Sequence, residues 1–80
     1  MMGAVAYGRK VHEDEVNVSY TFAIDPAAPE GVLVIPVADP DTWYVEGRET
    51  KPTAALRILG KAVLTFRRSG SWPEVVADQS

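Results

Sequence analysis

Few side chains in this 80-residue chain are suited to catalysis or to metal binding. Two small acidic groups are the candidates: the run from His12 to Glu15, and the pair Asp39 and Asp41. A histidine acting as a general base needs a pocket, and a calcium loop needs more oxygen ligands and a suitably placed glycine. The chain also has no cysteine and no glycine-rich phosphate loop. We therefore expect no catalytic residue, no cofactor and no metal site, and interpret both groups as exposed turn residues.

Basic residues are concentrated in one part of the chain. Residues 1–47 contain eight acids and two bases, residues 48–68 one acid and six bases, and residues 69–80 two acids, which gives the net charge of −3. Four of the six clustered bases are expected on a helix, at Arg57, Lys61, Arg67 and Arg68. Such a basic helix could contact phosphates, so nucleic-acid binding is the alternative function. The acidic average charge and the lack of a helix-turn-helix or aromatic RNA-binding motif argue against it.

Three aromatic residues are candidates for a protein-binding surface: Trp43, Tyr44 and Trp72. Tryptophan and tyrosine often dominate binding energy at interfaces. Trp72 follows the expected end of a helix and could instead fold back over the exposed end of the core. Both interpretations remain open at this stage.

Alternating apolar residues predict that the chain begins with a β-hairpin. The two strands, from Val5 to Val11 and from Val16 to Ile24, flank an acidic turn. If Glu13 and Asp14 form a two-residue loop, Tyr7 faces Tyr20, Arg9 faces Val18 and Val5 faces Phe22. This register gathers the large apolar side chains on one face and leaves small ones on the other.

The rest of the chain predicts one or two further strands and one helix. A loop rich in proline precedes a strand from Val32 to Val37, in which pairing should stop or bulge at Pro36. Residues Thr42 to Glu46 could form a short fourth strand. A helix is expected from about Pro52 to Arg68, ended by Gly70. Its core-facing side should contain Ala55, Leu56, Ile58, Leu59, Ala62, Val63 and Phe66.

Together these elements predict a single small domain, residues 1–80, of the α+β class. Its architecture would be a three- to four-stranded antiparallel meander sheet packed on one C-terminal amphipathic helix, with residues from Val76 to Ser80 frayed. A single helix covers one face of a sheet, so the other face should be open. The C-terminal segment or the proline-rich loop could cover that face instead.

An open, partly apolar face favours a non-enzymatic interaction or regulatory module. The expected partner is a protein, and a homodimer would stabilise so small a domain. No apolar run approaches the length needed to cross a membrane, and the start of the chain lacks the features of a secretory signal. We therefore expect no membrane partner and a cytoplasmic location.

Overall fold

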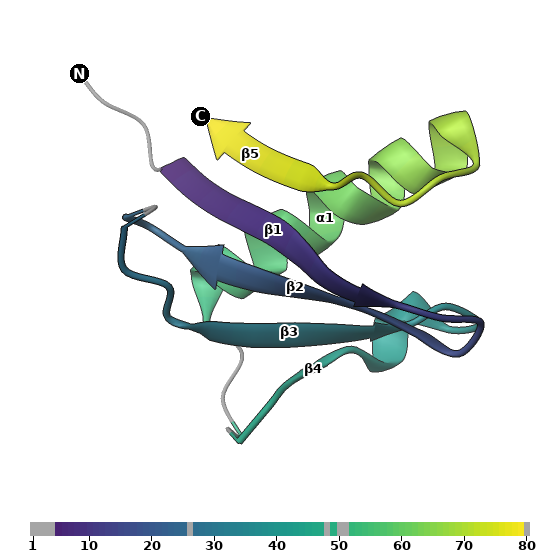
Figure 1. Cartoon of the computed structure of the whole chain (residues 1–80), viewed down its shortest axis with the longest axis horizontal. Helices are drawn as coiled ribbons and strands as arrows, with labels where there is room; N and C mark the ends of the chain where they lie inside the picture. Colours follow the sequence, from purple (N-terminus) through teal and green to yellow (C-terminus); the bar gives the residue numbers. More distant parts are fainter. Residues whose placement is uncertain (1–4, 26, 48, 50–51, 80) are drawn as a thin grey trace.

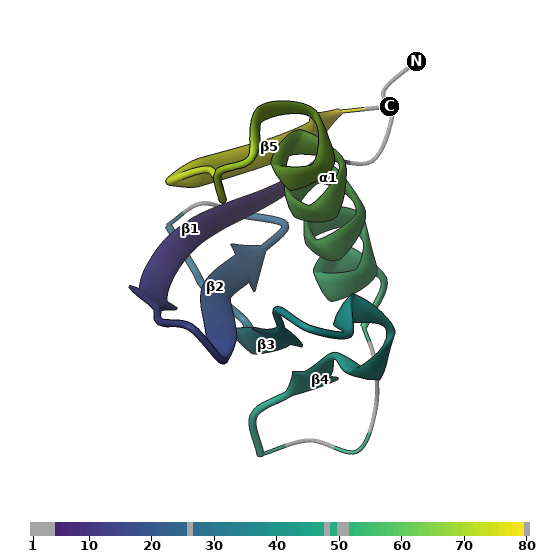
Figure 2. The same cartoon turned by 90° about the vertical axis from the view of Figure 1, so that its right-hand side faces the viewer.

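The chain forms two layers, an antiparallel sheet of five strands and one helix that covers one of its faces (Figures 1 and 2). The structure is a computed structural model that describes residues 5–25, 27–47, 49 and 52–79. The elements, in chain order, are β1 (Val5–Glu13), β2 (Asn17–Ala23), β3 (Gly31–Pro36), the 3-10 helix η1 (Pro40–Thr42), β4 (Tyr44–Val45), α1 (Thr53–Ser69) and β5 (Val75–Gln79). The strand order across the sheet is β4-β3-β2-β1-β5. This confirms the α+β class and adds a fifth strand.

The predicted hairpin is present, and Asp14 closes its turn. One carboxylate oxygen of Asp14 accepts hydrogen bonds from the backbone N–H groups of Val16 and Asn17, each at 2.8 Å. The backbone N–H of Asp14 also donates to the carbonyl of Asn17. A short aspartate side chain can hold a turn in this way, without the Asn-Gly pair of tighter hairpins.

The predicted register of the hairpin is wrong. Tyr7 pairs with Ala23, three residues beyond Tyr20, and the register shifts again at a bulge between Lys10 and His12. An odd displacement exchanges the faces of a strand, so Gly8 rather than Tyr7 lies on the side of α1. The packing explains this choice, because a Cβ on Gly8 would stand only 2.7 Å from Cγ2 of Ile58. A residue without a side chain is needed where α1 comes this close to β1.

The helix agrees with its sequence prediction apart from one leucine. It begins one residue after Pro52 and ends at Gly70, which adopts the left-handed conformation (φ 81°) and donates its N–H to the carbonyl of Phe66. Ala55, Ile58, Leu59 and Ala62 are buried as expected, and Ala54 joins them. Val63 and Phe66 pack against this core. Leu56 was predicted on the core side but is exposed, because it lies at the margin of the buried arc.

The predicted fraying of the C-terminus is also wrong for the part that the structure describes. Residues 75–79 form β5 beside β1, and Val76 is buried under α1. Trp72 precedes this strand and stacks on Phe66, with ring centroids 4.4 Å apart. The Tyr20 hydroxyl donates a hydrogen bond to the carbonyl of Pro73. These contacts hold the connection between α1 and β5 against the sheet.

One hydrophobic core lies between α1 and the sheet. Its largest fully buried side chains come from the sheet and from α1: Val18, Tyr20, Phe22, Leu33, Ile35, Val45 and Ile58. β3 ends at Pro36, as predicted, and β4 keeps only two residues of the expected strand because η1 precedes it. In the described part of the chain, no helix is long and apolar enough to span a membrane.

Candidate functional site

The four predicted phosphate-binding bases do not form one free surface. The Arg57 guanidinium lies 3.2 Å from the Asp78 carboxylate on β5, and both side chains are largely shielded from solvent. Lys61, Arg67 and Arg68 are exposed on α1. Arg57 therefore joins the helix to the sheet, which leaves three bases for contact with another molecule. Two further bases of the cluster, Arg48 and Lys51, lie outside the described residues.

The three candidate aromatic residues have different positions. Trp43 and Trp72 are both buried in the core, with 7% and 5% of their surface exposed. Tyr44 is about half exposed (49%) on β4. Of the three residues, Tyr44 is thus the most exposed and the best placed to contact a partner. The two tryptophans stabilise the fold.

The acidic groups bond within their own turns. The His12 ring nitrogen Nε2 lies 2.8 Å from the second carboxylate oxygen of Asp14. The hydrogen bonds from Asn17 and His12, followed by that from Val16, hold the pKa of Asp14 down at about 2. Asp39 accepts a hydrogen bond from the N–H of Asp41 at the start of η1. Among the residues that the structure describes, no three His, Cys, Asp or Glu side chains gather in a way that could hold a metal ion.

Lys10 forms a charged contact that the sequence did not indicate. Its ammonium lies 2.6 Å from the Glu13 carboxylate, 3.5 Å from that of Glu74 and 3.3 Å from the carbonyl of Trp72. The hydrogen bond with Glu13 is the main cause of its raised pKa. Lys10 therefore links the hairpin turn to the segment before β5, and its role is structural.

The face of the sheet opposite α1 is open, and Figure 1 views the molecule from this side. The C-terminal segment does not cross it, because it extends the sheet as β5, and the proline-rich loop reaches this face at Pro29. One row across the face runs Val75, Arg9, Thr21 and Val32 on neighbouring strands. On this face Ala23 of β2 and Val34 of β3 are already buried, whereas Val75 at the β5 edge is 64% exposed. The exposed apolar surface of this face therefore lies at its two edges, at Val75 on β5 and at Tyr44 on β4, which pairs with Val34.

A shallow hollow adjoins Val75 on this face. It has a volume of about 340 Å³. Its lining comes from three strands and the proline-rich loop: Tyr7, Gly8, Arg9, Thr21, Ala23, Pro29 and Val75. Its lining residues include one cation, Arg9, and two residues with hydroxyl groups, Tyr7 and Thr21. A side chain that enters it would meet apolar walls and hydrogen-bonding groups together.

The outer edge of β5 has unpaired backbone groups. Lys10 donates its backbone N–H to the carbonyl of Glu74. This hydrogen-bonded pair shows which positions along β1 and β5 are bonded to each other and which are not. In an antiparallel pair, hydrogen-bonded positions alternate with positions whose N–H and C=O groups point away. The backbone groups of Val75 and Ala77 consequently point away from β1, at an edge where no strand follows in the described sheet. This edge was not predicted, although the run Val75, Val76 and Ala77 is typical of a strand.

Comparison of the chain with protein-family models, with curated proteins and with solved structures found no match.

Proposed function

We propose that this protein is a non-enzymatic interaction module that binds a protein partner on the open side of its sheet, and that the partner is a second copy of the chain. The observation that carries the proposal is the unpaired edge of β5 beside the exposed Val75. Unpaired backbone groups on an edge strand are a template for another strand. A cytoplasmic location belongs to the same proposal.

The β5 edge is compatible with pairing to itself. A two-fold axis at Ala77 would place Val76 opposite Asp78 of the second copy, so that the two Asp78 carboxylates do not face each other. Each Asp78 already has a counter-charge in its own Arg57. Proline and lysine, which often protect edge strands, are absent from β5. Pairing of this kind would join the two sheets edge to edge into one continuous sheet and place a neighbouring strand beside Val75.

The substitution Ala77→Pro tests this interface. The N–H of Ala77 points away from β1, so a proline there would remove a donor from the outer edge without breaking a hydrogen bond of the fold. We expect the unmodified chain to dimerise in sedimentation equilibrium at about 0.5 mM, where a dimer with a Kd of about 0.1 mM is largely formed. Ala77→Pro should be a folded monomer by circular dichroism, and the control Ala77→Ser should remain a dimer.

Two outcomes would overturn the proposal. A wild-type chain that is monomeric at this concentration would exclude the second copy as the partner. A dimer that persists in Ala77→Pro would place the contact elsewhere on the molecule.

Nucleic-acid binding through α1 is the second candidate function. It is favoured by the three exposed bases Lys61, Arg67 and Arg68 on a helix that has no acidic residue. Titration of labelled single- and double-stranded DNA and RNA at low salt tests it by fluorescence anisotropy. Binding through these bases should weaken as salt rises and should be lost when all three are replaced by glutamate. Unchanged binding in that variant would reject this candidate.

A further inference from the structure

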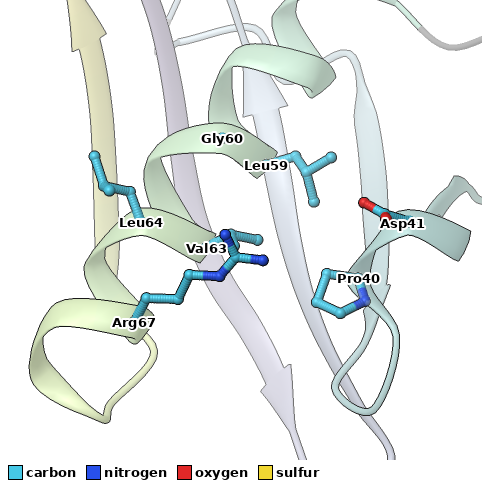
Figure 3. A pocket seen from close by; sticks show the side chains of 7 residues that line it. All are labelled: Pro40, Asp41, Leu59, Gly60, Val63, Leu64 and Arg67. Carbon is cyan, nitrogen blue, oxygen red and sulfur yellow. The ribbon is translucent and has the colours of Figure 1, made fainter.

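A groove runs between α1 and η1, on a different side of the molecule from the open sheet face (Figure 3). Its volume is about 380 Å³. The groove is lined by Pro40, Asp41, Leu59, Gly60, Val63, Leu64 and Arg67. Leu59 and Val63 lie on the side of α1 that faces η1, whereas Leu64 extends from the other side of the helix (Figure 3).

The apolar surface continues from the groove along α1. Leu56, Gly60 and Leu64 follow each other at intervals of four residues, so they form one line on the helix. Leu56 and Leu64 are 54% and 44% exposed. An added Cβ on Gly60 would have no neighbour within 4 Å, so packing inside the chain does not require glycine there. A partner could contact the two leucines and approach the helix backbone closely at Gly60, between them.

The charged residues around this line indicate which charge a partner should have. α1 contains no acidic residue, and Lys61, Arg67 and Arg68 are exposed on it; they outnumber the one carboxylate in the groove lining, that of Asp41 on η1. Figure 3 shows the Arg67 side chain extending over Val63 toward Pro40, at one end of the groove. A second copy docked symmetrically through this same surface would bring the same three bases against these, and like charges across an interface oppose association. A segment with acidic residues would instead be attracted.

From this geometry we propose that the groove and the exposed line of α1 bind an acidic, amphipathic segment of another protein. Its apolar side chains would pack on the exposed Leu56 and Leu64 and on the half-buried Val63, and its carboxylates would meet Arg67 and Lys61. The distance from Leu56 to Leu64 is about 12 Å along the helix, which suits anchors spaced over about two helical turns of the partner. The exposed leucines favour a protein over a nucleic acid, because phosphates gain nothing from them. This binding does not depend on the pairing of β5.

The test is selection from a phage-displayed library of random peptides of about 12 residues, long enough to span the groove. The immobilised bait is the full chain, and the variant Leu64→Ser with Arg67→Glu serves for counter-selection. We expect enriched peptides to combine glutamate or aspartate with leucine or other apolar residues at helical spacing. Their affinity, measured by fluorescence anisotropy with synthetic peptide, should fall at least about tenfold in the double variant. The control Val16→Ser, at an exposed valine in the hairpin turn, should bind like the wild type.

Three results would overturn this inference. Enrichment of basic or purely apolar peptides would contradict the assigned charge of the partner. Equal binding by the double variant, with its fold verified by circular dichroism, would place the contact outside the groove. Loss of the wild-type dimer in the same double variant would show that a second copy occupies the groove. The Ala77→Pro monomer should still bind the selected peptides, so failure of the dimer and failure of the groove are distinguishable.

Discussion

At the scale of single residues, two glycines of this chain have opposite roles. At Gly8 an added Cβ would stand 2.7 Å from Ile58 Cγ2 and 3.0 Å from the carbonyl oxygen of Thr21. Ile58 is fully buried, so a shift of its side chain would disturb the core around it. At Gly60 the same atom would have no neighbour within 4 Å. The first glycine is therefore needed for packing and the second is not.

We predict that Gly8→Ala lowers the free energy of unfolding by about 1 to 3 kcal/mol, the usual effect of overpacking a core. The matched control Gly60→Ala should raise it by up to about 1 kcal/mol, because alanine favours a helix interior more than glycine does. Urea unfolding followed by circular dichroism measures both. A Gly8→Ala variant as stable as the wild type would show that α1 does not approach β1 as closely as described.

The carboxylate of Asp14 should make stability depend on acid pH. Its pKa in the folded chain, about 2, lies below the ordinary value, so the ionised form favours folding. That contribution is complete above the ordinary pKa near 4 and is lost as the pH falls toward 2.

We therefore expect wild-type stability to exceed that of Asp14→Asn at pH 6 and the difference to shrink between about pH 5 and pH 2. Asparagine keeps an oxygen acceptor for the turn, so this comparison isolates the charge. Urea unfolding at several pH values measures the effect. A stability difference between the two proteins that does not change with pH would contradict the lowered pKa of Asp14.

At the scale of elements, the local features were predictable and the pairing of elements was not. The helix and its end follow from Pro52, Gly70 and a period of 3.6 residues, all of which act within one segment. The hairpin register depends on how Gly8 meets Ile58, fifty residues away in sequence. The alternation of apolar residues within one strand carries no information on such a contact. A pairing register displaced by an odd number of residues places every side chain of the strand on the opposite face.

The Arg57–Asp78 ion pair joins α1 to β5 across the sheet edge. A double-mutant cycle with Arg57→Met and Asp78→Asn should give a coupling energy on the order of 1 kcal/mol, because both side chains are partly shielded from solvent. Urea unfolding of the wild type, the two single variants and the double variant provides the four values. Additive effects of the two substitutions would mean that the contact adds no stability.

At the scale of the whole molecule, β5 completes the fold although it comes last in the chain. It pairs with β1, packs under α1 and contributes the buried Val76. We predict that a chain ending at Glu74 loses its cooperative thermal transition. Without β5, β1 becomes an unpaired edge strand and the core loses the buried side chain of Val76.

Circular dichroism and near-ultraviolet spectra during heating measure this loss. The control is Ala77→Pro, which retains β5 inside the monomer and should unfold cooperatively. A truncated chain that unfolds with the same midpoint as this control would show that β5 adds little to the core.

The sequence alone determined the α+β class, the position of the helix and the concentration of basic residues on it. It also indicated that one helix leaves one sheet face open. These properties follow from composition and short-range periodicity. The tertiary structure decided that β5 joins the sheet, that Trp43 and Trp72 are buried, and that Arg57 is paired with Asp78. It also left Leu56 and Leu64 exposed beside a groove. Each of these features depends on contacts between segments distant in sequence, whose geometry is fixed only when the layers pack.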